Sequence, residues 1–335
     1  MRIGIIYDRV ADYAHLEGTA DRFAEFEPES TILAMKQAIE LAGHIPVDIG
    51  SPHNLFTRPD IDLAWNIAEG YGSRNREAWA PILLEMHGIP FLGSDAYTLS
   101  ISLDKHLTRL IARHLDIPVV QGTSVSDPDA IDPADFTEFP VLLKPRYEGT
   151  AKGISPQSVV YNPVELKKVV QQMYHSYRQE ILVEQFLPGA EYTCSVYGSP
   201  LHPLPVIQRS IDRKSGLGVH AITNSQEIPD EDQILPGNLS IELEQELTEW
   251  SLKLCREMNV RHFARIDFKM DENGRPHFLE INPLPTFAVD SHFATFSEME
   301  GIDYPQFLAD MLQEIISDEL PSEVNRPITT PFSYP

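Results

Sequence analysis

The chain has few cysteines for its length and no long apolar run. Only two of its 335 residues are cysteine, Cys194 and Cys255, and their separation matches no metal-binding pattern. Two cysteines are too few for a disulfide framework, so we expect a reducing, cytoplasmic setting. No apolar stretch approaches the roughly 18 residues that a membrane-spanning helix requires. The N-terminus becomes charged too early for a signal peptide, and the sequence therefore predicts no membrane partner.

Basic residues are also scarce. The 26 Lys and Arg residues face 50 Asp and Glu residues, which gives a formal net charge of −24. Nucleic-acid binding needs basic surface that neutralises phosphates, so this balance excludes general nucleic-acid binding. An acidic protein that handles an anion should concentrate its few cations at that site. The HxH, HExxH and GxSxG patterns are absent, which disfavours zinc and serine-hydrolase chemistry.

Apolar periodicity predicts an α/β fold whose C-terminal part is α+β. In the first third, we expect strands at 2–7, 47–49, 61–68 and 89–92, with helices at 30–42 and 75–87. Ser30 is the expected cap of the first helix, and its core face would carry Ile32, Leu33, Ile39 and Leu41. This β-α-β alternation indicates a parallel sheet flanked by helices.

The rest of the chain changes character. Further strands are expected at 140–144, 181–185, 191–197 and 203–207, and helices at 103–115, 163–175, 241–258 and 304–317. We expect surface loops over 122–138, a long mobile loop over 208–238 and a disordered tail over 321–335. At this length, two or three domains are expected.

The most informative segment is an acidic hairpin. Alternating residues on both sides of Asn273-Gly274 predict two antiparallel strands and a type I′ turn, whose central residues both need positive φ. Asp267 then lies opposite Glu280, and Arg265 lies opposite Asn282. The other face would carry Ile266, Phe268, Leu279 and Ile281. Facing carboxylates repel, so these oxygens predict a bridging hard cation, with a solvated polar sheet face as the alternative.

A glycine-bracketed loop over 148–153 follows a buried strand. Gly149 and Gly153 would let backbone N–H groups approach an anion, and Thr150 adds a hydroxyl. The spacing is not that of a P-loop, and an ordinary turn is the alternative. Lys144 ends the preceding strand and is a candidate contact for phosphate oxygens. Its alternative is a lysine whose charged end reaches solvent.

Three more charged residues have two interpretations each. Glu184 and Glu191 flank the end of an apolar strand, where carboxylates can bind ribose hydroxyls or an exocyclic amine. The alternative is a charged domain boundary. Arg265 shares the hairpin face with the two acids, so it forms either a structural ion pair or a stabiliser of transition-state charge.

Three segments match known motifs in order. Gly93-Ser94 with Leu103-Asp-Lys105 is similar to a GS…DK segment, 143–153 to a VKP…EGSSxG loop, and 264–283 to a GRID…LEANTSPG segment. Together they resemble the ATP-grasp superfamily, and most closely the D-alanine–D-alanine ligases, from about 61 to about 292. The resemblance implies a three-domain ATP-grasp fold. Its domains would be an N-terminal substrate-side domain (1–102), a central domain (103–185) and a C-terminal domain (186–320).

The resemblance also implies an activity and its residues. The activity would be ATP- and Mg²⁺-dependent joining of a carboxylate to an amine through an acyl phosphate, for cell-wall D-alanyl-D-alanine, in a cytoplasmic homodimer. ATP would be bound by Lys105, Lys144, Gly149, Thr150, Gly153, Glu184, Gln185, Leu187 and Glu191. Two Mg²⁺ ions, or Mn²⁺, would be held by Asp267, Glu280 and Asn282. Catalysis would involve Arg265, Thr150 and Lys144.

Departures from the family pattern fall on amino-acid recognition. Residues 66–77 replace the family's HGxxGEDG stretch, and Thr286 stands at its oxyanion glycine. The loop over 208–238 lacks the family's tyrosine and offers Arg209, Arg213, Lys214 and His220. The candidates for the glutamate that binds the first substrate's ammonium are Glu25, Glu27 and Glu29. The substrate residues would be Glu27, Lys214, Thr286 and Ser291.

The substrates therefore stay open at this point. D-Alanine, other amino acids and small carboxylates are all compatible with the motifs. Two classes without this chemistry also remain: a non-catalytic nucleotide-binding protein on the same fold, and a two-domain protein that binds a small ligand without nucleotide.

Overall fold

The structure is a computed structural model of the 335-residue chain. It describes residues 1–19, 21–132, 135–136, 138–212, 214–218, 221 and 239–319. The expected tail over 321–335 and most of the expected mobile loop lie outside the described residues. In the described part of the chain, no helix is both long and apolar enough to cross a membrane.

The first sheet is parallel, as predicted. Its strands are β1 (Arg2–Ile6), β2 (Ile45–Gly50), β3 (Leu63–Asn66) and β4 (Phe91–Leu92), in the order β2-β1-β3-β4. The helices of this region are α1 (Glu29–Leu41), α2 (Trp79–His87) and α3 (Ala96–Ser102), with short 3₁₀ turns at Val10–Tyr13, Pro52–Phe56 and Arg76–Ala78. β1 and β3 are buried strands in the middle of this sheet.

Helix α1 differs from its prediction in its start and in its face. It begins at Glu29 after Pro28, whose side chain cannot cap a helix, so the expected cap at Ser30 is wrong. Ile32 and Ile39 are buried, but Leu33 and Leu41 are exposed to solvent. The helical repeat explains this: 32 and 39 are two turns apart on one face, whereas their immediate neighbours point elsewhere.

The second sheet is antiparallel. Its strands are β5 (Gly122–Val125), β6 (Val141–Pro145), β7 (Val159–Val160) and β8 (Ile181–Gln185), in the order β5-β8-β6-β7. Helices α4 (Lys105–His114) and α5 (Pro163–Tyr177) accompany it, with a 3₁₀ turn at Pro156–Ser158. β5 lies where surface loops were expected, and that part of the prediction is wrong. It is a polar edge strand that pairs with β8 through its backbone, so its sequence carries no apolar signal.

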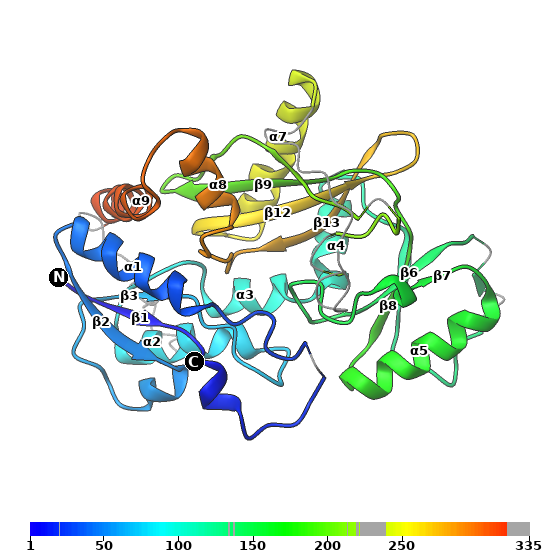
Figure 1. The fold of residues 1–335 in the computed structure, drawn as a ribbon, viewed down its shortest axis with the longest axis horizontal. Coiled ribbons are helices and arrows are strands. Elements are labelled where there is room, and N and C mark those ends of the chain that lie inside the picture. Colours follow the sequence, from blue (N-terminus) through cyan, green and yellow to red (C-terminus); the bar gives the residue numbers. More distant parts are fainter. Residues whose placement is uncertain are drawn as a thin grey trace, which may run out of the picture.

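The third sheet contains the acidic hairpin. Its strands are β9 (Glu191–Gly198), β10 (His202–Pro203), β11 (Ile207–Arg209), β12 (His262–Met270) and β13 (Pro276–Asn282). The order is β10-β9-β12-β13, and β11 also pairs with β9. The single strand expected at 203–207 is therefore two short ones. Helices α7 (Ile241–Glu257), α8 (His292–Met299) and α9 (Tyr304–Glu319) complete the fold (Figure 1).

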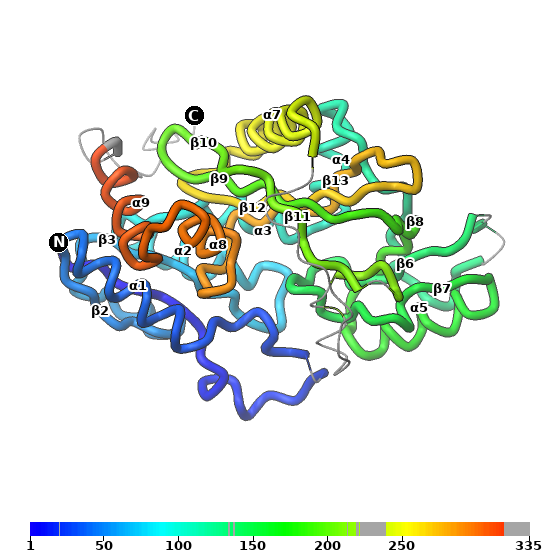
Figure 2. The backbone as a smooth tube through the Cα atoms, turned by 45° about the horizontal axis from the view of Figure 1, so that its top comes forward, coloured from blue at the N-terminus to red at the C-terminus, as the bar shows by residue number. Residues whose placement is uncertain are grey.

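The two ends of the described chain share one core. Helix α9 lies beside α1, next to the first sheet, in both ribbon and tube views (Figures 1 and 2). Ile3 and Met35 belong to the same buried apolar cluster as Phe287 and Leu308. The strands of the three sheets fall within the three expected domain ranges, while the ranges themselves remain a prediction, since this core crosses two of them.

Both cysteines lie in a second core, between the third sheet and α7. Cys194 on β9 and Cys255 on α7 are free thiols that are fully buried. Burial raises the pKa of the Cys194 thiol to about 11 and raises that of Cys255 further. Neither thiol is a nucleophile in this environment.

Candidate functional site

Strands β12 and β13 place the acidic residues as the hairpin pattern predicts. Asp267 pairs with Glu280, and Arg265 pairs with Asn282. Beyond Asp267 the register shifts, because Phe268 pairs with Phe278. The prediction is therefore confirmed at the site and wrong nearer the turn.

Leu279 is the extra residue of this bulge. It does not join Ile266 in the core, as expected; Phe278 is buried there instead, and Leu279 lines a cavity. A bulge adds one residue to one strand, so side chains beyond it change face. Two adjacent apolar residues, Phe and Leu, satisfy the alternation in either register, which is why the sequence does not reveal the bulge.

The turn of the hairpin is not type I′. Of residues 271–275, all described by the structure, only Gly274 has a positive φ, of 73°. The Asp271 carboxylate accepts the N–H groups of Asn273, at 2.8 Å, and Arg275, at 2.9 Å. These side-chain bonds fix a four-residue turn in which one glycine provides the left-handed position.

Cations surround the two facing carboxylates. Arg265 Nε lies 3.0 Å from Asp267 Oδ2, and Lys105 Nζ lies 3.1 Å from Glu280 Oε2. Thr193 donates its hydroxyl to Asp267 at 2.7 Å. Burial raises the pKa of Asp267 against the opposing effect of Arg265. For Glu280, burial acts in the same direction, but Lys105 and Arg265 outweigh it and lower the pKa to about 2.

The hairpin fits a hard cation that arrives with its own oxygen ligands. Among the described residues, no three Asp, Glu, His or Cys side chains form a metal site by themselves. Asp267 and Glu280 supply carboxylates, and Asn282 supplies a carboxamide oxygen. Mg²⁺ is usually held by one or two carboxylates together with phosphates and water. A solvated polar face is not what the structure shows, since the Asp267 side chain is 8% exposed.

A buried ion network lies on the neighbouring wall. Lys144 Nζ lies 2.7 Å from Glu184 Oε2, and Arg109 Nη1 lies 2.9 Å from Glu184 Oε1. All three side chains are buried, so the alternative of a lysine reaching solvent does not hold for Lys144. Arg109 was not among the expected site residues. Its signal in the sequence is its place one helical turn after Lys105 on α4.

A cavity of about 140 Å³ collects most of the expected nucleotide residues. Those that line it are Lys105, Lys144, Thr150, Glu184, Gln185, Leu187 and Glu191. Its apolar walls include Val120, Leu142, Ile154, Phe186, Leu217 and Leu279. A lining that combines apolar surface with a few charged and hydrogen-bonding groups is typical of a cofactor or nucleotide site.

Lys269 is a further member of this cavity that sequence reasoning missed. Its Nζ lies 3.5 Å from Glu191 Oε2 and donates to the carbonyl oxygen of Gly216 at 3.0 Å. The side chain is buried. The alternation of side chains along the strand could have identified Lys269, since it places residues 265, 267 and 269 on one face.

The glycine-rich loop binds anionic groups, but these belong to the chain itself. Gly149 donates its N–H to Glu25 Oε1 at 2.7 Å, and Gly153 donates its N–H to Asp21 Oδ2 at 2.9 Å. In this conformation the two N–H groups are therefore not directed at a phosphate, unlike the expectation. Thr150, between them, has a φ of 47° and lines both this cavity and a larger one.

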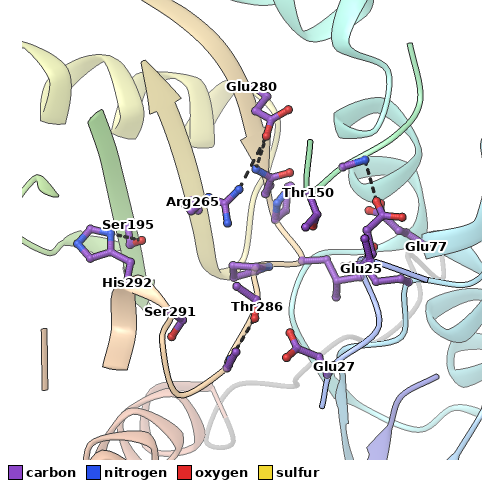
Figure 3. Close-up of a pocket in the computed structure, with 18 of the residues that line it drawn as sticks. Glu25, Glu27, Glu77, Thr150, Ser195, Arg265, Glu280, Thr286, Ser291 and His292 are labelled. Atoms are coloured by element: carbon purple, nitrogen blue, oxygen red, sulfur yellow. Dashed lines mark hydrogen bonds and ion pairs between the residues drawn. The ribbon is translucent and has the colours of Figure 1, made fainter. Parts of the chain in front are cut away.

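The larger cavity, of about 350 Å³, is drawn in Figure 3. It adjoins the first cavity, since Arg265 and Glu280 line both. Of the expected substrate residues, Glu27, Thr286 and Ser291 line it. Lys214 is exposed and is not among the described residues that line it, whereas Arg209 is. Arg213 and His220 lie outside the described residues.

The structure separates the three candidate glutamates. Glu25 is buried and already paired with Arg76 and Lys152. Glu29 is exposed at the start of α1. Glu27 faces the larger cavity and accepts the Thr31 hydroxyl at 2.9 Å; burial raises its pKa. Among the described residues no cation pairs with Glu27, so of the three glutamates it is the one that lines this cavity without a cationic partner.

A serine and a histidine form an unexpected pair on the opposite wall of this cavity. Ser195 Oγ lies 2.7 Å from His292 Nδ1 (Figure 3), and His292 Nε2 lies 3.1 Å from the carbonyl oxygen of Pro205. A carbonyl only accepts, so Nε2 carries the proton and Nδ1 accepts the serine hydroxyl. Burial lowers the pKa of His292 to about 3, so the ring is neutral and a weak base.

Known proteins match both the sequence and the fold. A family model described as the C-terminus of D-Ala–D-Ala ligases matches residues 117–313. The uncharacterized protein y4sG of Sinorhizobium fredii is 24% identical over 251 residues, 75% of this chain and 73% of its own. A D-alanine–D-alanine ligase of Pseudomonas putida is 27% identical over 293 residues, 85% of this chain and 87% of its own.

A solved structure extends the match to nearly the whole chain. The D-alanine–D-alanine ligase of Bacillus anthracis, crystallised in complex with ATP, superposes with a TM-score of 0.70 at 24% identity. The match covers 96% of this chain and 98% of that one. A parallel N-terminal sheet followed by two antiparallel sheets thus defines an ATP-grasp fold. The chain belongs to the D-alanine–D-alanine ligase family.

Proposed function

We propose that the protein is an ATP- and Mg²⁺-dependent ligase that joins the carboxylate of one amino acid to the amine of another. D-Alanine is the leading candidate for both. The observation that carries this proposal is the contact of two cavities across Arg265 and Glu280. One has the lining expected for a nucleotide, and the other offers Glu27 to an amine-bearing substrate.

The smaller cavity supports nucleotide binding. Lys105 and Lys144, which now pair with Glu280 and Glu184, would hold phosphate oxygens. The apolar residues of the lining suit an adenine ring, and the Glu191 carboxylate suits ribose hydroxyls. Asp267, Glu280 and Asn282 would hold Mg²⁺, which when bound neutralises phosphate charge.

The larger cavity supports the order of bond making. Glu27 would bind the first substrate's ammonium and leave its carboxylate near Arg265. The γ-phosphoryl group then passes to a carboxylate oxygen, giving an acyl phosphate and ADP. The amine of the second substrate attacks the carbonyl carbon, phosphate leaves with the C–O bonding pair, and the amine loses a proton. Arg265 would stabilise the oxyanion, and Ser291 would bind the second carboxylate.

The identity of the substrates depends on the larger cavity, where the chain departs from its family. Thr286 replaces the oxyanion glycine, and Ser195 with His292 shapes one wall. A ligase that joins other amino acids or small carboxylates is therefore the second candidate. Thr286, Ser195 and His292 are not among the described residues that line the nucleotide cavity, so both candidate functions share the same ATP chemistry.

The test is phosphate release from Mg-ATP by the purified full-length chain, across single amino acids and pairs that include D-alanine. Mass spectrometry would identify the products. Release with D-alanine and formation of the dipeptide supports the proposal, whereas release only with another pair supports the second candidate. No release with any pair, despite ATP binding, would contradict both candidates and favour a non-catalytic nucleotide-binding protein.

A pair of hairpin variants makes this assay specific. Asp267→Asn removes a charge from the cation site and should abolish turnover while nucleotide still binds. Glu272→Gln removes a charge from the exposed turn of the same hairpin and should leave turnover unchanged.

A further inference from the structure

A buried ion cluster ties the N-terminal segment to the glycine-rich loop. The carboxylate of Glu25 contacts Arg76 and lies 2.9 Å from Lys152 Nζ; it also accepts the N–H of Gly149. These three charged side chains are 3% to 5% exposed. Glu148 also pairs with Lys152. The cluster therefore joins three parts of the chain that are far apart in sequence.

A second tether holds the other end of the same loop. Asp21 Oδ2 accepts the N–H of Gly153 at 2.9 Å and the Tyr177 hydroxyl at 2.7 Å. The loop over 149–153 is thus bound at both ends by carboxylates from residues 21–25. Carboxylates take the hydrogen bonds that an anion would otherwise receive from these two N–H groups.

The charges in the cluster depend on one another. Burial alone would raise the pKa of Glu25, but Arg76 and Lys152 outweigh it and lower the pKa. Burial raises the pKa of nearby Glu77 to about 7, although Arg76 opposes it. Removing one partner of a buried ion pair leaves an uncompensated charge, so the loop position depends on the cluster being complete.

The tethered segment also reaches the substrate cavity. Glu27, two residues after Glu25, lines the larger cavity, and Thr150, next to Gly149, lines both cavities. A short piece of chain, 21–27, therefore contacts the amino-acid site at one end and the phosphate-side loop at the other. Two sites that bias the same element are coupled.

We propose that Glu25 is a positioning residue that holds the loop over 149–152 against the nucleotide cavity through Lys152. The segment 21–27 thereby couples occupancy of the larger cavity to nucleotide binding in the smaller one. This inference rests on the proposed function, because it takes the smaller cavity as a nucleotide site. Glu25 also lines the larger cavity, but its carboxylate is already engaged by Arg76, Lys152 and the Gly149 N–H, and it acts through the last two.

The test measures the dissociation constant of the Mg complex of a non-hydrolysable ATP analogue, with and without D-alanine. The variants are Lys152→Met, Glu25→Gln and their combination, with Lys167→Met on exposed α5 as the control. Lys152→Met leaves the contacts of Arg76 with Glu25 and Glu77 in place, so the fold should survive. Hydrogen exchange would report the protection of Gly149 and Gly153 in each variant.

We expect Lys152→Met to weaken analogue binding about tenfold and to expose the Gly149 amide, with the control unchanged. The double variant should bind no more weakly than the weaker single one, because both act through one contact. D-Alanine should tighten analogue binding in the wild type and lose this effect in Lys152→Met.

Two results would overturn the proposal. One is a Gly149 amide that exchanges faster in Lys152→Met while analogue affinity and its response to D-alanine stay at wild-type values. The other is additive losses in the double variant, which would mean that Glu25 and Lys152 act separately. A wild-type chain that does not bind the analogue at all would instead refute the proposed function, and this inference with it.

Discussion

Lys269 places a positive charge where the nucleotide cavity meets the segment at Gly216. It pairs with Glu191, the residue proposed for the ribose, and donates to the Gly216 carbonyl oxygen. A carboxylate held by an ammonium is fixed in direction, so its free lone pairs can accept hydroxyls without reorganisation. Lys269 therefore orients Glu191 and also connects it to the chain after β11.

Replacing Lys269 by methionine should raise the KM for ATP about tenfold, because Glu191 loses the charge that directs it. The kcat should change little, since the contacts of Lys269 are with Glu191 and Gly216 and not with Arg265. Steady-state kinetics with varied ATP would measure both constants, with Lys168→Met on the exposed face of α5 as the control. A fall in kcat at unchanged KM would contradict this role.

His292 makes stability depend on pH in a definite direction. Burial lowers its pKa in the folded protein to about 3, from an ordinary value of 6.5. As pH falls below 6.5 the unfolded chain takes up a proton here, while the folded chain stays neutral until about 3. The unfolded state binds more protons in this window, so the free energy of unfolding decreases as pH decreases.

His292→Gln should remove this dependence, because glutamine keeps one acceptor for Ser195 and one donor for Pro205 but does not titrate. Between about pH 7.5 and about pH 5.5, the wild type should lose about 1.4 kcal/mol more unfolding free energy than the variant. Urea denaturation at the two pH values measures the difference. Equal losses in both proteins would show that His292 titrates normally in the fold.

At the scale of elements, the loop between β3 and α2 depends on a close backbone approach. Gly70 has a φ of 64° and donates its N–H to Asp8 Oδ2 at 2.7 Å. A Cβ at this position would lie 2.8 Å from the carbonyl oxygen of Arg76. The glycine therefore lets the loop fold tightly enough to bring Arg76 to Glu25.

Gly70→Ala should destabilise the protein more than Gly88→Ala, which has the same φ of 64° but open space around the added Cβ. The shared left-handed strain costs about 1 to 2 kcal/mol in each. The clash with Arg76 should add about 1 to 3 kcal/mol in Gly70→Ala alone. Equal unfolding free energies of the two variants in urea would show that the loop yields without strain.

The same elements show how far sequence patterns reach. β8 has its predicted bounds because four buried residues in a row give a clear apolar signal. The pairing of Asp267 with Glu280 was predictable because strand alternation is strict near the site. β5 was not, since an edge strand is held by backbone bonds, and the Leu279 bulge was hidden by a neighbouring Phe. Local sequence patterns thus predict buried helices and strands, but they miss features that depend on pairing with a neighbouring strand.

At the scale of the whole molecule, scarce positive charge is concentrated as expected for an acidic protein that handles an anion. The buried lysines and arginines of the described residues are Lys105, Lys144, Lys152, Lys269, Arg76 and Arg109. The four lysines line one or both cavities, and the two arginines pair with glutamates that line them. The composition predicted that positive charge would gather at an anion site. It did not predict which glutamates these lysines and arginines would pair with.

Long-range contacts explain what the sequence left undecided. Gly149 and Glu25 are 124 residues apart, and no local pattern links them. The same holds for Ser195 and His292, 97 residues apart, and for the packing of α9 on α1. Contacts of the same kind separate the candidate glutamates: Arg76 and Lys152 bind Glu25, whereas Glu27 lines the cavity without a cationic partner among the described residues.

The buried thiols have a practical consequence. Cys194 and Cys255 are fully enclosed, and burial raises the pKa of both, so maleimide dyes should leave the folded native chain unlabelled. Two cysteines introduced at exposed positions would then be the reactive thiols, with no need to replace the native pair. Dyes placed on α5 and on α1 would report, by energy transfer in single molecules, how the second sheet moves against the first.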